Sequence, residues 1–249
     1  MSPYERFKEE CVEEVFIQGA DAQLVCGTRQ WMNQANAQKY SYHFEWLGRP
    51  IIQYPQDVIA MQELIWSIQP DLIIETGIAH GGSLIFSASM LELNAACGGP
   101  QDAEVLGVDI DIRAHNRAAI TAHPMVKRIS MVQGSSIAPE IIGQVQAKAA
   151  GRRRVLVYLD SNHTHEHVLA ELKAYAPLTS VGSYCVVFDT VIEDMLAGTF
   201  PDRPWGPGNN PKTAVREYLK SHPEFEIDKQ IDYKLLITVA PDGYLKRVV

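Results

Sequence analysis

The 249-residue sequence has no paired cysteine motif, no long apolar run and no excess of basic residues. Its four cysteines lie far apart, which excludes a Cys-x-x-Cys site and gives no sign of a disulfide framework. No segment approaches the roughly 20 apolar residues of a membrane span, and the first residues lack the pattern of a secretory signal. The formal net charge of −8 disfavours a nucleic-acid or anionic-membrane surface. We therefore expect a cytoplasmic protein that binds neither nucleic acid nor membrane.

The chain changes character near residue 70. Before that point the pattern predicts helices near residues 4–18, 28–39 and 56–68. After it, short apolar strands alternate with helices, which predicts right-handed crossovers and a mostly parallel sheet. The expected strands are residues 71–75, 104–109, 128–132, 155–160 and 183–189, and the expected helices are 81–93, 113–122, 137–150, 165–175 and 212–221.

Residues 235–240 and 244–249 flank the turn Pro241-Asp242-Gly243, which predicts a closing antiparallel hairpin. Such a hairpin is more typical of Rossmann-type methyltransferases than of dinucleotide dehydrogenases. We therefore expect an α/β, Rossmann-type methyltransferase fold over residues 70–249, with residues 1–69 as an N-terminal helical extension or lid.

The first strand–helix turn runs from Glu75 to Ser83 and is rich in glycine. Gly77 and Gly81 would let the backbone approach a ligand, and the following helix offers free N–H groups at its start. Ala79 stands where a dinucleotide motif has its second glycine. Glu75 is placed to pair with a cationic ligand such as the methionine moiety of S-adenosylmethionine. A simple tight turn is the alternative interpretation.

Two further strand ends complete a candidate cofactor site. Asp109 ends the second strand, where an acid typically binds ribose hydroxyls, and Asp111 competes for this role. Ser135 and Ser136 follow the third strand, where adenine-contacting loops lie in such folds. A helix N-cap explains either serine equally well.

Acidic residues also end two neighbouring predicted strands, at Asp160 and Asp189. Carboxylates brought to one sheet edge suit Mg²⁺, which keeps waters that substrate oxygens can displace. His163 follows three residues after Asp160, so its imidazole would be placed to accept a hydroxyl proton. The alternatives are capping roles for the acids and a hydrogen-bonding role for the histidine.

Zinc and iron centres fit the same histidines less well. The run from His163 to His167 matches the His-x-x-Glu-His spacing of one zinc protease class, but its first histidine follows the strand too closely to lie in a helix. His222 and Glu224 have the spacing of an iron oxygenase pair, yet no later histidine completes a facial triad.

From about residue 40 to the C-terminus, the sequence resembles the cephalosporin hydroxylase family. The resemblance is carried by these segments: Trp46–Pro55 with Gln53, Glu75-Thr76-Gly77, Gly81-Gly82-Ser83, Gly107-Val108-Asp109, Leu159–His163 and Asp189-Thr190. It implies a Rossmann-type fold, S-adenosylmethionine, a Mg²⁺ site and a homo-oligomer. It makes Glu75, Gly77 and Asp109 cofactor residues, Asp160 and Asp189 metal ligands, and His163 the base.

One position departs from the family pattern. Relatives end the metal strand with Glu-Asp, whereas this chain has Phe188-Asp189, and phenylalanine cannot bind Mg²⁺. Thr190 could replace it through its hydroxyl or a water, or Glu193 or Asp194 could fold back instead. The third alternative is that the metal binds more weakly or not at all.

The predicted function is Mg²⁺-assisted O-methylation of a small-molecule hydroxyl, such as that of a sugar or a glycosylated natural product, by S-adenosylmethionine. The loop Phe200–Pro211 suits a substrate lid or a surface connection. The rival functions are a non-catalytic cofactor-binding or assembly protein and a small-molecule hydroxylase.

Overall fold

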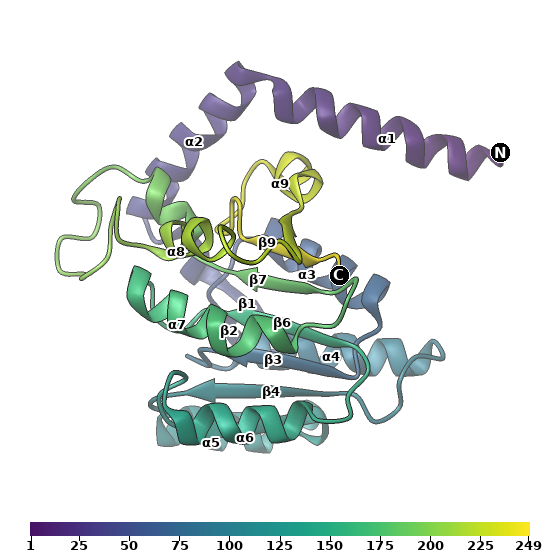
Figure 1. Ribbon diagram of the computed structural model, residues 1–249, viewed down its shortest axis with the longest axis vertical. Helices are drawn as coiled ribbons and strands as arrows, with labels where there is room; N and C mark the ends of the chain where they lie inside the picture. The colour runs from purple at the N-terminus through teal and green to yellow at the C-terminus, as the bar shows by residue number, and fades with distance from the viewer.

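The computed structural model describes all of residues 1–249 and shows a twisted sheet with helices on both faces (Figure 1). Seven strands form this sheet in the order β5-β4-β3-β6-β7-β9-β8, and β1 pairs with β2 in a separate hairpin. The strands are β1 (Phe44–Trp46), β2 (Arg49–Ile51), β3 (Leu72–Thr76), β4 (Glu104–Asp109), β5 (Ile129–Gln133), β6 (Val155–Leu159), β7 (Tyr184–Val187), β8 (Phe225–Ile227) and β9 (Tyr244–Arg247).

The α-helices are α1 (Pro3–Ala20), α2 (Ala22–Ala37), α3 (Pro55–Ile68), α4 (Gly82–Ala96), α5 (Ala114–Ala122), α6 (Pro139–Ala149), α7 (His165–Tyr175), α8 (Pro211–Tyr218) and α9 (Lys229–Leu235). Short 3₁₀ helices are η1 (Tyr40–His43), η2 (Pro124–Arg128), η3 (Ala176–Leu178) and η4 (Thr190–Asp194). No helix combines the length and apolar content that crossing a bilayer needs.

The central strands are buried on both faces, as their continuous apolar sequences require. Strands β5, β4, β3, β6 and β7 run parallel. On one face Ile73 and Leu156 join a core with α3 and α4, while on the other Ile74 and Val157 pack with α6, α7 and α8. The predicted Rossmann-type fold is confirmed.

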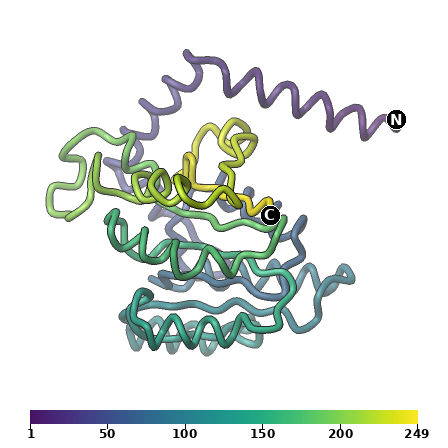
Figure 2. Tube along the Cα trace, viewed as in Figure 1, coloured from purple at the N-terminus to yellow at the C-terminus, as the bar shows by residue number.

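The N-terminal segment divides into two structurally different parts. Helix α1 has no buried residue and extends away from the body, touching α9 near its end (Figures 1 and 2). There Gln18 Nε2 donates to the Tyr233 carbonyl at 2.6 Å. By contrast, the hairpin β1–β2 and α3 share the core of the sheet through residues such as Ile51 and Ile65.

The C-terminal antiparallel pair is present, but one of its strands was placed wrongly from the sequence. Strand β9 lies between β7 and β8 and is antiparallel to both. Residues 235–240, expected as a strand, form none: Leu235 ends α9, and a side chain takes the place of a strand partner for Val239. The buried Asp57 carboxylate accepts from the Val239 N–H at 2.9 Å and from the Thr238 hydroxyl.

Candidate functional site

The carboxyl ends of β3, β4, β6 and β7 meet at one edge of the sheet, and the predicted site residues lie there. Strands β3 and β6 are neighbours although six elements of the chain, α4 to α6, separate them, so the strand order reverses between them. Ligands of open α/β sheets bind in the crevice at such a reversal.

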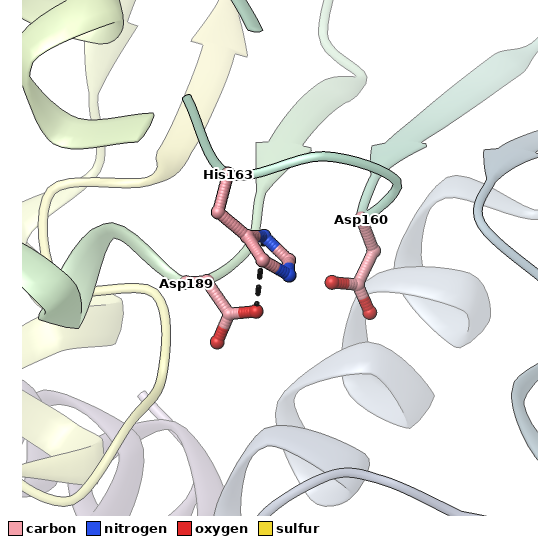
Figure 3. A group of neighbouring side chains, drawn as sticks. All are labelled: Asp160, His163 and Asp189. Atoms are coloured by element: carbon pink, nitrogen blue, oxygen red, sulfur yellow. Dashed lines mark ion pairs between the residues drawn. The ribbon is translucent and has the colours of Figure 1, made fainter. Parts of the chain in front are cut away.

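Asp160, His163 and Asp189 form a compact cluster at this edge (Figure 3). One ligand atom from each lies within 4.8 Å of the others. His163 Nδ1 lies 3.3 Å from Asp189 Oδ2, and the Asp160 carboxylate points toward the same space (Figure 3). The structure therefore brings together the three residues that the sequence pattern singled out.

The backbone fixes both carboxylates. The Asp160 N–H donates to the Thr76 carbonyl at 3.0 Å, which ties the end of β6 to β3. Asp189 has a φ of 56°, a left-handed conformation that non-glycine residues rarely adopt. This turn ends β7 and starts η4, and such strained positions cluster at functional sites.

Phe188 turns away from the cluster into the core. It is 3% exposed and its ring packs edge-on against Tyr158, with the ring centroids 5.8 Å apart. The end of β7 therefore offers the cluster one carboxylate, that of Asp189.

The charges of the cluster suit a divalent cation. Burial raises the pKa of Asp160 well above its usual range, and the nearby negative charge of Asp189 raises it further. A cation between the two carboxylates would remove this repulsion, and carboxylate oxygens are ligands that Mg²⁺ prefers. The donor set of the cluster therefore fits Mg²⁺.

The structure does not bring Thr190 into this donor set, contrary to expectation. Thr190 is fully buried and its hydroxyl donates to the Pro241 carbonyl at 2.7 Å. The two acids that follow it are also held elsewhere. Glu193 accepts from the Gly208 N–H at 2.8 Å, and Asp194 pairs with Lys212 at 2.6 Å.

Gln53 reaches the cluster from the segment between β2 and α3. Its Nε2 donates to Asp160 Oδ2 at 3.2 Å, and the side chain is 3% exposed. Its Oε1 is buried without a hydrogen-bond partner. In the sequence, Gln53 stands out only because its segment resembles the family. Its position in the sequence gives no sign of a contact with Asp160.

A cavity of about 550 Å³ opens over the cluster. Its walls come from η1 and neighbouring residues, from η4 and from the loop before α8, and they include Lys39, Tyr42, Phe200, Arg203 and Trp205. This volume is in the range of small-molecule sites. The Trp205 ring meets His163 edge-on at 5.5 Å, so the predicted lid loop forms part of the cavity wall.

A second, smaller pocket of about 110 Å³ adjoins this cavity. It brings together Gly77, Asp109, Ser135 and Ser136, all predicted from the sequence as cofactor residues. Ser161 lines both spaces, which places the small pocket next to the metal-type cluster.

His167 also lines the small pocket and was not predicted there. Its Nε2 lies 3.0 Å from the Ser136 hydroxyl and 3.7 Å from the Glu171 carboxylate, which is almost fully buried. His165 instead joins α7 to α8, through Thr213 at 2.8 Å and Glu217 at 3.1 Å. The two histidines point to different faces of α7. The sequence alone does not tell which of them faces Ser136.

The glycine-rich turn is held by Asp109. Its carboxylate accepts from the main-chain N–H groups of Ile78 and Ala79 at 2.8 and 3.3 Å. Gly77 has a φ of 90°, and a Cβ there would collide with the Asp160 carbonyl oxygen. Gly81 has a φ of 85° and precedes α4. Only residues without a side chain allow these approaches.

Glu75 lies behind the turn and is 3% exposed. One of its oxygens accepts from the Ser83 hydroxyl, while Oε2 has no partner. Burial raises the pKa of Glu75 to about 8, against the lowering effect of the Ser83 hydrogen bond. A buried acid with a free oxygen suits a cationic ligand group.

Known proteins resemble this chain in sequence and in fold. Residues 38–248 match the model of the family described as Rhamnosyl O-methyltransferase/CmcI. The Rhamnosyl O-methyltransferase of Mycobacterium tuberculosis (strain ATCC 25618 / H37Rv) is 33% identical over 198 residues, which cover 77% of this chain and 73% of that protein.

Two solved structures of CmcI share the fold, each with 18% identity over 84% of this chain. One is an apo-structure, with a TM-score of 0.57 and 77% of its chain covered, and the other is described as Mg-SAM, with a TM-score of 0.55 and 78% covered. The family predicted from the sequence motifs is therefore confirmed: the chain belongs to the Rhamnosyl O-methyltransferase/CmcI family.

Proposed function

We propose that this protein is an O-methyltransferase that uses S-adenosylmethionine and Mg²⁺ to methylate a hydroxyl group of a sugar-bearing small molecule. One observation carries the proposal. A carboxylate–imidazole cluster lies in a cavity that shares Ser161 with the pocket of the predicted cofactor residues. The name of the mycobacterial relative supports O-methylation of a sugar, and the description of a CmcI structure as Mg-SAM supports the two cofactors.

The small pocket and the turn behind it would hold the methyl donor. Asp109 and the two serines line the pocket, and the start of α4 presents main-chain N–H groups. The free oxygen of Glu75 would pair with the cationic end of the donor. Asp160 and Asp189 would hold Mg²⁺ beside it.

Bound S-adenosylmethionine would supply an electrophilic methyl group, and bound Mg²⁺ would lower the pKa of the acceptor hydroxyl. His163 would take the hydroxyl proton on Nε2, because Nδ1 faces Asp189 at 3.3 Å. The Asp189 carboxylate would then stabilise the imidazolium, as an acid does for a catalytic histidine in hydrolases. His163 would keep the proton that leaves the acceptor hydroxyl as the methyl group is transferred.

The cavity walls suit a sugar. Trp205 and Phe200 offer aromatic faces, with ring centroids 5.3 Å apart, and Lys39 and Arg203 offer hydrogen-bond donors. Holding the acceptor in line with the methyl group supplies much of the rate gain in such bimolecular reactions.

Titration calorimetry with S-adenosylmethionine, with and without Mg²⁺, tests the proposal together with a turnover assay on rhamnosides and other glycosides. We expect donor binding and release of S-adenosylhomocysteine that requires Mg²⁺. A protein that does not bind S-adenosylmethionine contradicts the proposal. Donor binding unaffected by Mg²⁺, without turnover on any acceptor, would instead favour a non-catalytic cofactor-binding protein.

A further inference from the structure

We propose that the side-chain amide oxygen of Gln53 is a direct ligand of the divalent cation held by Asp160 and Asp189. This inference rests on the proposed metal site and adds to it a neutral ligand from outside the sheet. Gln53 lies between β2 and α3, so the cation would join the N-terminal hairpin to the ends of β6 and β7.

The side-chain oxygen of Gln53 is buried and unpaired. Gln53 is 3% exposed and lines the cavity over the cluster, yet its Oε1 has no hydrogen-bond partner. Buried side-chain oxygens nearly always have a partner, and one without is explained by a ligand, an ion or a water. Amide oxygens bind hard cations well.

The distance between the Gln53 amide and the Asp160 carboxylate fits two ligands of one cation. Gln53 Nε2 lies 3.2 Å from Asp160 Oδ2. A half-turn of the terminal amide exchanges its oxygen and nitrogen, which places Oε1 at about that distance from the carboxylate. Two oxygens so close repel unless a cation lies between them. Adjacent ligands of an octahedral Mg²⁺, each about 2.1 Å from the metal, lie about 3 Å apart.

Three other neutral side-chain oxygens near the cluster already have partners. Asn36 Oδ1 accepts from the Tyr54 hydroxyl at 2.6 Å, and the Ser161 hydroxyl donates to Glu171 at 2.7 Å. The Thr190 hydroxyl is bound to a main-chain carbonyl, and Phe188 lies in the core. The Gln53 amide reaches Asp160, and its oxygen has no competing partner.

The experiment uses Mn²⁺ as the probe, because it accepts the same oxygen ligands as Mg²⁺ and is paramagnetic. Electron paramagnetic resonance measures the affinity of the full-length protein for Mn²⁺. Water-proton relaxation counts the waters bound to the ion. The matched control is Gln56→Ala, which removes another buried, unpartnered glutamine oxygen that does not line the cavity.

We expect Gln53→Ala to weaken Mn²⁺ binding on the order of tenfold or more and to add one bound water, since water takes the position of the amide. Gln53→Glu, which supplies a charged oxygen at the same position, should bind Mn²⁺ more tightly than the wild type. Gln56→Ala should match the wild type in both measurements. Thermal melting without metal identifies any variant that fails to fold, and Gln53→Glu then carries the test.

An unchanged water count in Gln53→Ala would overturn the inference, because Gln53 would then act only as a hydrogen-bond donor to Asp160. That result leaves the proposed metal site intact if Asp160→Asn still abolishes Mn²⁺ binding. Absence of Mn²⁺ binding by the wild type would overturn the metal site and this inference together.

Discussion

Replacing Glu75 by glutamine tests whether the structure holds a buried acid in place for a cationic cofactor. Glu75 is 3% exposed, accepts one hydrogen bond from Ser83 and has one oxygen without a partner. Burial raises its pKa from 4.5 to about 8. Glutamine keeps the shape and can still accept from Ser83, but it cannot ionise.

The pKa shift sets the sign and size of the effect on stability. The pKa of Glu75 is higher in the folded protein than in the unfolded chain. The contribution of protonated Glu75 to stability is therefore fully present below about pH 4.5 and is lost as the pH rises through about 8. Between pH 4.5 and 7 the unfolded chain releases the proton and the folded chain keeps it. At about 1.4 kcal/mol per pH unit, the free energy of unfolding falls by about 3 kcal/mol over this range.

Urea denaturation at pH 5, 7 and 8.5 measures this difference. Between pH 5 and pH 7, we expect the free energy of unfolding of Glu75→Gln to rise by up to about 3 kcal/mol relative to that of the wild type. Glu45→Gln, at an exposed position, is the control and should follow the wild type. Parallel pH profiles for Glu75→Gln and the wild type would refute the reasoning.

The same variant should bind S-adenosylmethionine more weakly. A cationic donor favours the ionised form of Glu75, so binding to the wild type at pH 7 should release a proton. Calorimetry in buffers with different ionisation enthalpies counts that proton. Glu75→Gln should release fewer protons, and equal release by both proteins would show that Glu75 is not the titrating group.

Three further substitutions test other parts of the account. His163→Ala should lower kcat by about 10² to 10⁴ at saturating Mg²⁺ while S-adenosylmethionine affinity stays constant; unchanged turnover would exclude His163 as the base. Asp57→Ala should lower the free energy of unfolding by about 1–3 kcal/mol in urea melts, since it leaves the buried Val239 N–H without an acceptor, and an unchanged midpoint would contradict this. Gly77→Ala should weaken S-adenosylmethionine binding measured by calorimetry, because its φ of 90° and the nearby Asp160 carbonyl exclude a Cβ; wild-type affinity would show that the turn can adapt.

The sequence predicts much of the sheet and part of the site, for a physical reason. Parallel strands bring their carboxyl ends to one edge, so acids that follow apolar runs can be placed together without coordinates. Asp160 and Asp189 were found in this way, and so were Asp109 and the two serines that line the small pocket.

Side-chain direction in loops could not be predicted. The left-handed turn at Asp189 leaves the Thr190 hydroxyl facing the Pro241 carbonyl, and no residue pattern in the sequence predicts that turn. Gln53 meets Asp160 across 107 positions of sequence, and only the packing of the hairpin onto the sheet reveals the contact. Residues 235–240 do not form the predicted strand, and the Val239 N–H donates to the distant Asp57 carboxylate instead of to a strand partner.

The most direct measurement is a crystal structure of the protein with S-adenosylhomocysteine and Mg²⁺. We expect the nucleoside in the pocket of Asp109 and Ser135, with its sulfur facing the cavity. We also expect Mg²⁺ between Asp160 and Asp189, within about 2.1 Å of a carboxylate oxygen from each. A nucleoside bound elsewhere, or Mg²⁺ absent from the cluster at saturating concentration, would contradict the proposed reaction.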